Sequence, residues 1–470
     1  MNQVISDEFY KYNLKADKKQ VAECSEEEHF VVILQDMEDL YEKYVRCGCK
    51  VTTDSRAISG GEIFFALKGD NFDGNDYALK ALEAGAAWAV VDRDAKADGD
   101  ARLIRVEDPF RTLQELAITH RHKALGDRHL PLIGLTGTNG KTTTKELICA
   151  VLSKKFRVTA TKGNLNNDIG VPLSILSIRP DTRIAVIEMG ASHPDDIAKL
   201  VRVCQPDYGL ITNVGKAHLL GFGSLEGVKA AKGELYKWLG TRSDSVIFLN
   251  EDDSDLREMA STQPCHCFGY GLRYQNAVLG KTTPESPFLS IILDGQTIRT
   301  RLVGAYNATN VLAAMAVGEY FGVPRKDAAS AIEEYEPVNN RSQMTRTERN
   351  TLIIDAYNAN PSSMAAAIDN FAAIESNSKL ALLGDMRELG EDSVREHIEI
   401  IRRLSRCGIK AIFAGEEFRK ALEAEDVKDA EVFRTSEDMA ARLGENPVSG
   451  ATILIKGSRG MQMEKVVPCL

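Results

Sequence analysis

The chain has 470 residues, of which 43% are hydrophobic and 7% aromatic, and a formal net charge of −10 at pH 7. This length exceeds one typical hydrophobic core and indicates about two to four domains. The acidic balance argues against a nucleic-acid partner, and no apolar run approaches the ~18 residues that cross a bilayer. The start, MNQVISDEFYKYNLK, lacks the apolar segment of a signal peptide. We therefore expect a cytoplasmic, monomeric globular protein.

The nine cysteines are scattered along the chain. Cys47/Cys49 and Cys265/Cys267 are the close pairs, and one intervening residue is a shorter spacing than that of a zinc knuckle. We therefore predict thiols without a metal role, in a reducing compartment.

The first segment is polar and acidic up to Glu28 and then contains the apolar run HFVVILQ. In MEDLYEKYVRCG, apolar residues recur at helical spacing and Gly48 is placed to end the helix. The first domain is therefore predicted to begin near Met37, with residues 1–36 as an extension that is disordered or not native. The strand-like runs IFFAL, WAVV and LIRV, with the helical stretch YALKALEAGA, predict a small mixed α/β domain over residues 37–108.

From Pro109 onward, apolar runs alternate with helical segments, which is typical of a parallel sheet covered on both faces. The runs LIGLTG, RVTAT, RIAVIEMG, YGLITNVG and SVIFLN belong to a central domain over residues 109–322, which also contains short antiparallel strands at 271–303 and the helix NATNVLAAMAVGEYFG. A second alternation, TLIIDAYNANP, KLALLGDM, KAIFAG and ATILIKGSRG, predicts a Rossmann-like C-terminal domain over residues 323–470.

The stretch GLTGTNGKTTTKELICAVL begins at Gly134 and ends a strand-like run. A common P-loop reads G-x-x-x-x-G-K-[ST], but here Leu135 stands where its first glycine belongs. Strand, glycine turn and helix N-terminus together present backbone N–H groups to a phosphate. In a nucleotide site, Lys141 would reach the terminal phosphates and the Thr142 hydroxyl would bind Mg²⁺. The alternative, a glycine turn that precedes a lysine by chance, fits this context poorly.

Three further residues have two interpretations each on sequence alone. Glu188 follows an apolar strand and either binds a metal at the mouth of the strand or faces solvent. His218, in ITNVGKAH, is either a functional residue or an ordinary packed histidine. Lys232, in AAKGELY, is either part of a site or a solvated helical lysine.

The motifs GLTGTNGKTTT, IEMGASH, ITNVGKAH and AAKGELY, in this order, resemble the central domain of the Mur ligases of peptidoglycan synthesis. Their relatives are the folylpolyglutamate synthases. GNLNNDIGVPLSIL (163–176), DAYNANPSSM (355–364) and LGDMRELG (383–390) resemble the branch that adds D-alanyl-D-alanine to UDP-MurNAc-tripeptide. TTDSRAISGGEIFFALKGDNFDGNDY (52–77) resembles a UDP-binding N-terminal domain of the family. Two departures are the segment 1–36 and Asn340, where the family usually has glycine before the arginine.

The resemblance implies an α/β fold of three domains: a UDP-binding domain, a central P-loop ATPase-type domain and a C-terminal Rossmann-like domain. It implies ATP and two Mg²⁺ ions as cofactors, with UDP-MurNAc-tripeptide and D-alanyl-D-alanine as substrates. The residues that it implies for ATP are Gly137, Thr138, Asn139, Gly140, Lys141, Thr142, Thr143, Asn307 (adenine), Arg341 (phosphates), Asp355 (ribose) and Tyr357 (base). Those that it implies for the metals are Thr142 and Glu188 for one ion, and His218 with a carbamylated Lys232 for the other.

For the substrates, the resemblance implies a uridine nucleotide set and a muramyl-peptide set. These are Asp54, Ser55, Arg56, Lys68 and Asp73 for the nucleotide, and Asn164, Asn167, His193, Asn358 and Asn360 for the peptide side. Catalytic roles are implied for Lys141, Glu188, His218, Lys232 and Arg341.

The chemistry is consistent with these parts. A carboxylate has no leaving group, so its ligation to an amine requires activation, and ATP can convert it to an acyl-phosphate. Such a site requires metals and lysines rather than a covalent protein nucleophile. The enzyme alternatives are another Mur ligase, of the MurE-like branch, and a folylpolyglutamate synthase, although the latter family lacks the UDP-binding domain. An ATPase that acts as a nucleotide-driven switch is the alternative from another class, and its turnover would not depend on D-Ala-D-Ala.

Overall fold

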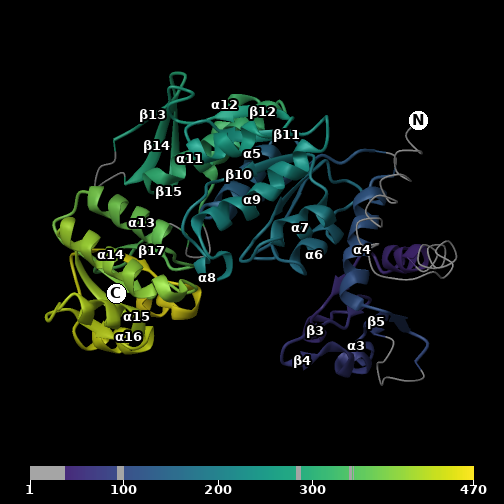
Figure 1. The fold of residues 1–470 in the computed structure, drawn as a ribbon, viewed down its shortest axis with the longest axis horizontal. Helices are drawn as coiled ribbons and strands as arrows, with labels where there is room; N and C mark the ends of the chain where they lie inside the picture. Colours follow the sequence, from purple (N-terminus) through teal and green to yellow (C-terminus); the bar gives the residue numbers. More distant parts are fainter. Residues whose placement is uncertain (1–36, 93–99, 127, 282–286, 338–340, 342) are drawn as a thin grey trace. The chain divides into compact units, whose positions relative to one another are not determined.

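The computed structural model describes residues 37–92, 100–126, 128–281, 287–337, 341 and 343–470. The expected extension 1–36, with its HFVVILQ run, and Asn340 lie outside these ranges. Two compact units make up the chain, Met1–Leu116 and Ala117–Leu470 (Figure 1). Within the described ranges, none of the helices has both the length and the apolar character needed to span a bilayer.

The first unit begins with the predicted helix, which covers residues 37–46. Gly48 has φ 66°, and its N–H bonds to the Val45 carbonyl at 3.0 Å. The predicted helix and its glycine stop are therefore confirmed. A four-stranded parallel sheet follows in the order β1-β2-β5-β6, and helix α3 (Ala78–Glu83) packs on it. The chain between β2 and β5 also forms a short antiparallel pair, β3-β4. The bounds are β1 Val51–Thr52, β2 Ile63–Phe65, β3 Lys68–Gly69, β4 Phe72–Asp73, β5 Trp88–Asp92 and β6 Leu103–Val106.

The helix α4 (Pro109–Lys123) runs through the division between the two units. The second unit then contains a six-stranded parallel sheet in the order β12-β11-β10-β7-β9-β8. Its strands are β7 Leu132–Thr136, β8 Val158–Ala160, β9 Ile184–Glu188, β10 Tyr208–Ile211, β11 Val246–Asn250 and β12 His266–Tyr270. All residues of β7, β9 and β11 are buried, as expected for strands between two layers of helices.

The five predicted central strands are confirmed, whereas β12 was not predicted. This strand lies at the edge of the sheet and only its last residue, Tyr270, is buried, so its sequence HCFGY lacks an apolar run. The chain passes from β7 to β8 on one side of the sheet and later to β10 on the other side. Strand β7 therefore lies at a topological switch point, where α/β sheets bind ligands at their carboxyl edge.

Helices cover this sheet on both faces (Figure 1). The helices in this part of the chain are α5 Lys141–Ser153, α6 Gly170–Leu176, α7 Asp196–Cys204, α8 Leu219–Phe222, α9 Leu225–Gly240, α10 Ser254–Ser261, α11 Ala308–Tyr320 and α12 Arg325–Glu334. The expected antiparallel strands are β13 Val278–Leu279, β14 Phe288–Leu293 and β15 Gln296–Val303. Helix α12, which the prediction assigned to the C-terminal domain, packs in the same core as β7 and α5 through Ala328 and Ile332.

The last part of the chain forms a second six-stranded sheet, in the order β16-β17-β21-β18-β19-β20, in which only β16 is antiparallel. Its strands are β16 Gln343–Arg346, β17 Thr351–Asp355, β18 Lys379–Gly384, β19 Lys410–Ala414, β20 Glu431–Phe433 and β21 Thr452–Lys456. The helices are α13 Pro361–Ala373, α14 Ser393–Arg406, α15 Glu416–Ala424 and α16 Ser436–Glu445. The predicted Rossmann-like alternation is confirmed, and β21 inserts between β17 and β18.

Candidate functional site

The loop between β7 and α5 requires glycine at two positions. Gly137 and Gly140 have φ 146° and φ 77°. A Cβ on Gly137 would lie 1.9 Å from Thr212 Oγ1, and one on Gly140 would lie 2.7 Å from Asn310 Oδ1. Because no side chain fits at either position, the loop can lie close to β10 and α11. Helix α5 then begins at Lys141, and its unpaired N–H groups are placed to bind an anion.

A pocket of about 860 Å³ opens at this helix N-terminus, between the carboxyl edges of the two sheets. The structure brings most of the sequence-predicted residues of the second unit to its wall: Thr138, Asn139, Gly140, Lys141, Thr142, Thr143, Asn167, Glu188, His193, His218, Asn307, Arg341, Asp355, Tyr357, Asn358 and Asn360. Three predicted residues do not line it: Gly137, Asn164 and Lys232.

The ammonium group of Lys141 folds back onto its own loop. Its Nζ donates to the carbonyls of Gly137 at 2.6 Å and Thr138 at 3.0 Å. Burial lowers the pKa of Lys141, with Glu188 opposing that shift and Arg341 adding to it. A phosphate oxygen would offer this lysine a charged partner in place of neutral carbonyls.

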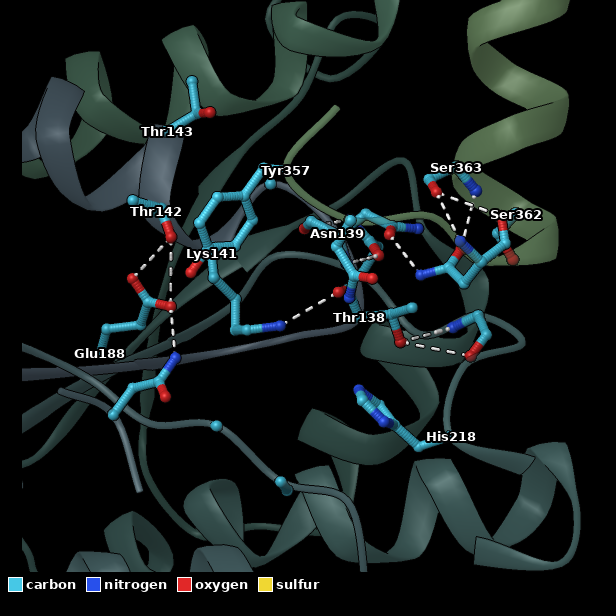
Figure 2. A pocket seen from close by; sticks show the side chains of 18 of the residues that line it. Thr138, Asn139, Lys141, Thr142, Thr143, Glu188, His218, Tyr357, Ser362 and Ser363 are labelled. Carbon is cyan, nitrogen blue, oxygen red and sulfur yellow. Dashed lines mark hydrogen bonds between the residues drawn. The ribbon is translucent and has the colours of Figure 1, made fainter. Parts of the chain in front are cut away.

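The buried pair Thr142 and Glu188 joins the start of α5 to the end of β9 (Figure 2). Thr142 Oγ1 lies 3.0 Å and 3.3 Å from the two carboxylate oxygens of Glu188. The amide of Asn166 donates to the same carboxylate at 2.9 Å. Glu188 therefore faces the pocket rather than solvent, and a hydroxyl and a carboxylate offer adjacent oxygen ligands.

The loop after β10 lies against the P-loop. Asn213 Oδ1 accepts from the N–H of Asn139 at 3.0 Å, and Thr138 Oγ1 accepts from the N–H of Gly215 at 3.0 Å. His218, further along this loop, has φ 51° and forms a hydrogen bond through Nδ1 with the carboxylate of Glu388. The His218 side chain therefore reaches the C-terminal part of the chain.

Two lysines and a carboxylate influence the pKa of His218. Burial lowers the pKa of His218, Glu388 opposes the shift, and Lys141 and Lys232 add to it. Lys232 is 2% exposed, and its Nζ lies 5.8 Å from the centre of the Phe222 ring. Burial and the charge of Lys141 lower the pKa of Lys232 well below its ordinary value. Lys232 is therefore no solvated helical lysine, although it does not reach the pocket wall.

Asn307 and Asn310 are buried at the start of α11. Asn307 donates to the Val303 carbonyl at 2.9 Å and accepts from Asn310 at 2.9 Å. Asn310 in turn accepts from the hydroxyl of Thr144 at 3.0 Å. This chain of hydrogen bonds ties α11 to α5 behind the P-loop.

The C-terminal sheet supplies the opposite wall. The guanidinium of Arg341 lies 3.5 Å from the centre of the Tyr357 ring, and its buried Nε has no hydrogen-bond partner among the residues that the structure describes. Lys456 donates to Asp355 Oδ2 at 2.5 Å. Asn360 caps α13 and donates to Asn139 Oδ1 at 2.9 Å. The wall thus presents an aromatic ring, a cation and a carboxylate to the P-loop.

Family models match three parts of the chain. They are described as "Mur ligase family, catalytic domain" (residues 50–127), "Mur ligase middle domain" (residues 135–318) and "Mur ligase, glutamate ligase domain" (residues 340–459). The UDP-N-acetylmuramoyl-tripeptide–D-alanyl-D-alanine ligase of Bacillus subtilis (strain 168) is 36% identical over 440 residues, which cover 91% of this chain and 93% of that protein. The chain belongs to the Mur ligase family.

Solved structures agree with this membership. MurF from Acinetobacter baumannii has a TM-score of 0.78 and 28% identity, covering 89% of this chain and 92% of that one. MurF ligase from Thermotoga maritima, solved in complex with ADP, has a TM-score of 0.76 and 28% identity, covering 89% of this chain and 96% of that one. The expected family and fold class of this Mur ligase are therefore confirmed.

The residues expected on the muramyl-peptide side of the Mur ligase have structural contacts of their own. Asn167 Oδ1 accepts from the N–H of Gly170, the first residue of α6, at 2.8 Å. His193 Nδ1 lies 3.0 Å from Ser192 Oγ, and Asn358 Oδ1 accepts from the N–H of Ala359 at 2.9 Å. Asn164 is exposed on the loop before Asn167 but outside the pocket wall.

The expected uridine nucleotide residues lie on the first unit of the Mur ligase. Arg56 donates two hydrogen bonds of 2.9 Å to Asp54, and this pairing lowers the pKa of Asp54 to about 2. Ser55 lies between them, at the start of a short 3₁₀ helix. Lys68 forms an ion pair with Asp92, and Asp73 lies 4.0 Å from the same ammonium. Two basic side chains, each held by a carboxylate, are thus presented on this unit.

Sequence reasoning missed several pocket residues of the Mur ligase. Asn166, Asn213, Asn310 and Lys456 all line the pocket. The first two stand inside quoted motifs, GNLNNDIG and ITNVG, so their proximity to predicted residues could have indicated them. Asn310 stands three residues after Asn307, one helical turn on. For Lys456, the only signal was its place at the end of an apolar strand.

Proposed function

We propose that this Mur ligase is an ATP-dependent ligase that adds D-alanyl-D-alanine to UDP-MurNAc-tripeptide through an acyl-phosphate. The observation that carries the proposal is the likeness to the Bacillus subtilis tripeptide ligase, which extends over 93% of that protein. The pocket adds support because its P-loop, buried carboxylate and opposing arginine suit phosphoryl transfer. ATP as the nucleotide is consistent with the ADP complex of the Thermotoga maritima neighbour.

In this proposal, the P-loop and the C-terminal wall hold the nucleotide between them. Residues 137–143 bind the phosphates, and Lys141 exchanges its two carbonyl contacts for phosphate oxygens. Arg341, whose Nε has no hydrogen-bond partner within the described part of the chain, reaches the phosphates from the other wall. Tyr357 lies beside the base, Asp355 accepts from the ribose, and Asn307 contacts adenine through its second amide hydrogen or lone pair.

The residues present fit one Mg²⁺ between Thr142 and Glu188. Their adjacent hydroxyl and carboxylate are the oxygen ligands that this ion prefers, and it retains waters and phosphate oxygens as its other ligands. Among the described residues, no group of three or more His, Cys, Asp or Glu side chains could hold a metal by itself. This agrees with an ion held largely by ATP. Such an ion would neutralise the charge that develops on the transferred phosphoryl group.

We also propose that Lys232 is carbamylated and holds a second Mg²⁺ with His218. Lys232 is buried, and burial together with the charge of Lys141 lowers its pKa well below the ordinary value, which favours the neutral amine. A neutral amine in such a place can add CO₂, and the resulting carbamate is an oxygen anion suited to Mg²⁺. The imidazole of His218 lies close enough to Lys232 for its pKa to respond to that lysine.

The substrates would then meet at the same pocket. The terminal carboxylate of the tripeptide attacks the γ-phosphate of ATP, and ADP leaves. The amine of D-Ala-D-Ala attacks the acyl-phosphate carbon, releases inorganic phosphate and loses a proton. Asn164, Asn167, His193, Asn358 and Asn360 lie on the muramyl-peptide side in this proposal, and the uridine nucleotide binds at Asp54, Ser55, Arg56, Lys68 and Asp73. We propose that the ligase acts as a monomer in the cytoplasm.

A coupled phosphate-release assay tests the reaction. Each of ATP, Mg²⁺, UDP-MurNAc-tripeptide and D-Ala-D-Ala is omitted in turn, and we expect every omission to abolish release. Turnover with glutamate and a folate at an equal rate would instead indicate a folylpolyglutamate synthase. ATP turnover that ignores D-Ala-D-Ala would indicate a nucleotide-driven switch.

A further inference from the structure

Lys456 is a buried lysine in the wall of the pocket. It ends β21, and its register partner on the neighbouring parallel strand β17 is Asp355. Both residues line the pocket, but Lys456 is only 1% exposed. A lysine at the buried carboxyl edge of a sheet requires partners for its charge, because an unpaired buried ammonium is strongly unfavourable.

The ammonium group of Lys456 has two such partners, and both belong to one turn. Its Nζ donates to Asp355 Oδ2 at 2.5 Å and to the carbonyl of Asn358 at 3.2 Å. The ammonium of a lysine has three N–H donors, so Lys456 can donate to the carboxylate and to the carbonyl at the same time. The two ends of the segment 355–358 are thereby tied to β21.

That segment carries the nucleotide-facing groups of the C-terminal wall. Tyr357, which lies between the two tied residues, stacks against Arg341, and Asn360 just beyond them donates to Asn139 of the P-loop. In Figure 2, Tyr357 and Asn139 face the same pocket. A shift of this segment would therefore move the aromatic ring and the link between the two sheets together.

We propose that Lys456 is a positioning residue that orients the Asp355 carboxylate toward the ribose of ATP. The inference rests on the proposed contact between Asp355 and the ribose. With one of its oxygens bonded to the ammonium, the carboxylate has a defined rotamer, and its remaining lone pairs can accept from a ribose hydroxyl. A lysine that served stability alone would not change how strongly the enzyme distinguishes the sugar of its nucleotide.

The test compares ATP with 3′-deoxyATP and 2′-deoxyATP as substrates, by kcat and KM for phosphate release at saturating peptide substrates. We expect the wild type to prefer ATP over at least one deoxy analogue, and Asp355→Asn to lose most of that preference. Lys456→Met should lose it as well, with about a tenfold rise in KM for ATP and a smaller change in kcat, as for one charge-assisted hydrogen bond. Lys456→Arg, which keeps a charged donor, should recover part of the preference.

Two further variants keep the test decisive. Asp355→Asn/Lys456→Met leaves no unpaired buried charge and should discriminate no less than Asp355→Asn alone, because Lys456 acts through Asp355. Lys379→Met is the matched control. Lys379 is the first residue of the neighbouring strand β18, so it lies at the amino ends of the strands, away from the pocket, and it donates to the Ala372 carbonyl at 2.6 Å. It should keep the full preference for ATP.

The outcomes separate the two ideas. If Asp355→Asn loses the preference while Lys456→Met keeps it, the positioning role is overturned and the ribose contact stands. If Asp355→Asn keeps the preference, the proposed ribose contact is wrong and the positioning role is overturned with it. If the double variant loses further discrimination beyond Asp355→Asn, Lys456 does not act through that carboxylate, and the inference is likewise overturned.

Discussion

Replacing Lys232 by methionine should stabilise the ligase while inactivating it. Lysine and methionine have stems of similar length, and that stem is already buried in both, so the substitution removes chiefly the ammonium. Lys232 is 2% exposed, its Nζ lies 5.8 Å from the centre of the Phe222 ring, and burial and the charge of Lys141 both disfavour its protonated form. Because burial penalises this amine, removing it should stabilise the fold by about 1–3 kcal/mol.

The assay is thermal unfolding in buffer freed of CO₂, followed by the same measurement with bicarbonate. For a unit of this size, a gain of that magnitude should raise Tm by about 2 °C or more. Bicarbonate should raise the Tm of the wild type, because a carbamate that forms in the folded protein stabilises it by mass action. Bicarbonate should leave the Tm of Lys232→Met unchanged, because this variant has no amine to form the carbamate.

Lys145→Met is the matched control. Lys145 is also buried in this domain, at 4% exposure, but donates to the Thr161 carbonyl at 2.8 Å. Its replacement leaves that carbonyl unpaired and should lower Tm. The reasoning about Lys232 is refuted if Lys232→Met unfolds at a lower temperature than the wild type in CO₂-free buffer, or if it keeps most of its activity. An unchanged wild-type Tm in bicarbonate would contradict the carbamate alone.

Three other predictions concern the pocket and the packing around it. Lys141→Ala should lower turnover by about 100-fold or more with an unchanged circular dichroism spectrum, and near-normal turnover would remove the P-loop from the mechanism. Burial lowers the pKa of His120 to about 4, so protonation favours the unfolded state. Stability should fall by about 3 kcal/mol as the pH drops from 6.5 to 4, and His120→Gln should show a smaller loss in urea titrations across that range. Lys216 donates to Glu396 at 2.8 Å and so links the loop after β10 to α14. Because the Lys216 side chain is half exposed, solvent weakens this ion pair, and Lys216→Ala should raise KM for ATP by about fivefold or less in the phosphate-release assay. A larger rise would mean that this ion pair has a greater part in ATP binding than a surface ion pair can have.

Much of the fold could be predicted because its signals are local. Strands such as β7 and β9 are continuous apolar runs, and buried parallel strands have that pattern wherever they lie in a sheet. The P-loop was predictable for the same reason, since Gly137, Gly140 and Lys141 are neighbours in sequence and the turn requires glycine. The edge strand β12 escaped prediction because it is only partly buried and so lacks the apolar signal.

The residues of the candidate site likewise fall into those that local sequence predicts and those that only the tertiary structure brings together. The sequence by itself determined the P-loop, the carboxylate at the end of β9 and the family, because each depends on residues that are close together in the chain. Only the tertiary structure decided that Glu388 faces His218, that Asn139 meets Asn360 and that Lys456 pairs with Asp355. These contacts depend on strand order and on the approach of one sheet to the other, and β21 reaches its place beside β17 after the chain has built three other strands of that sheet. Local periodicity carries no information about such an insertion, because a buried strand has the same apolar pattern at every position in the sheet.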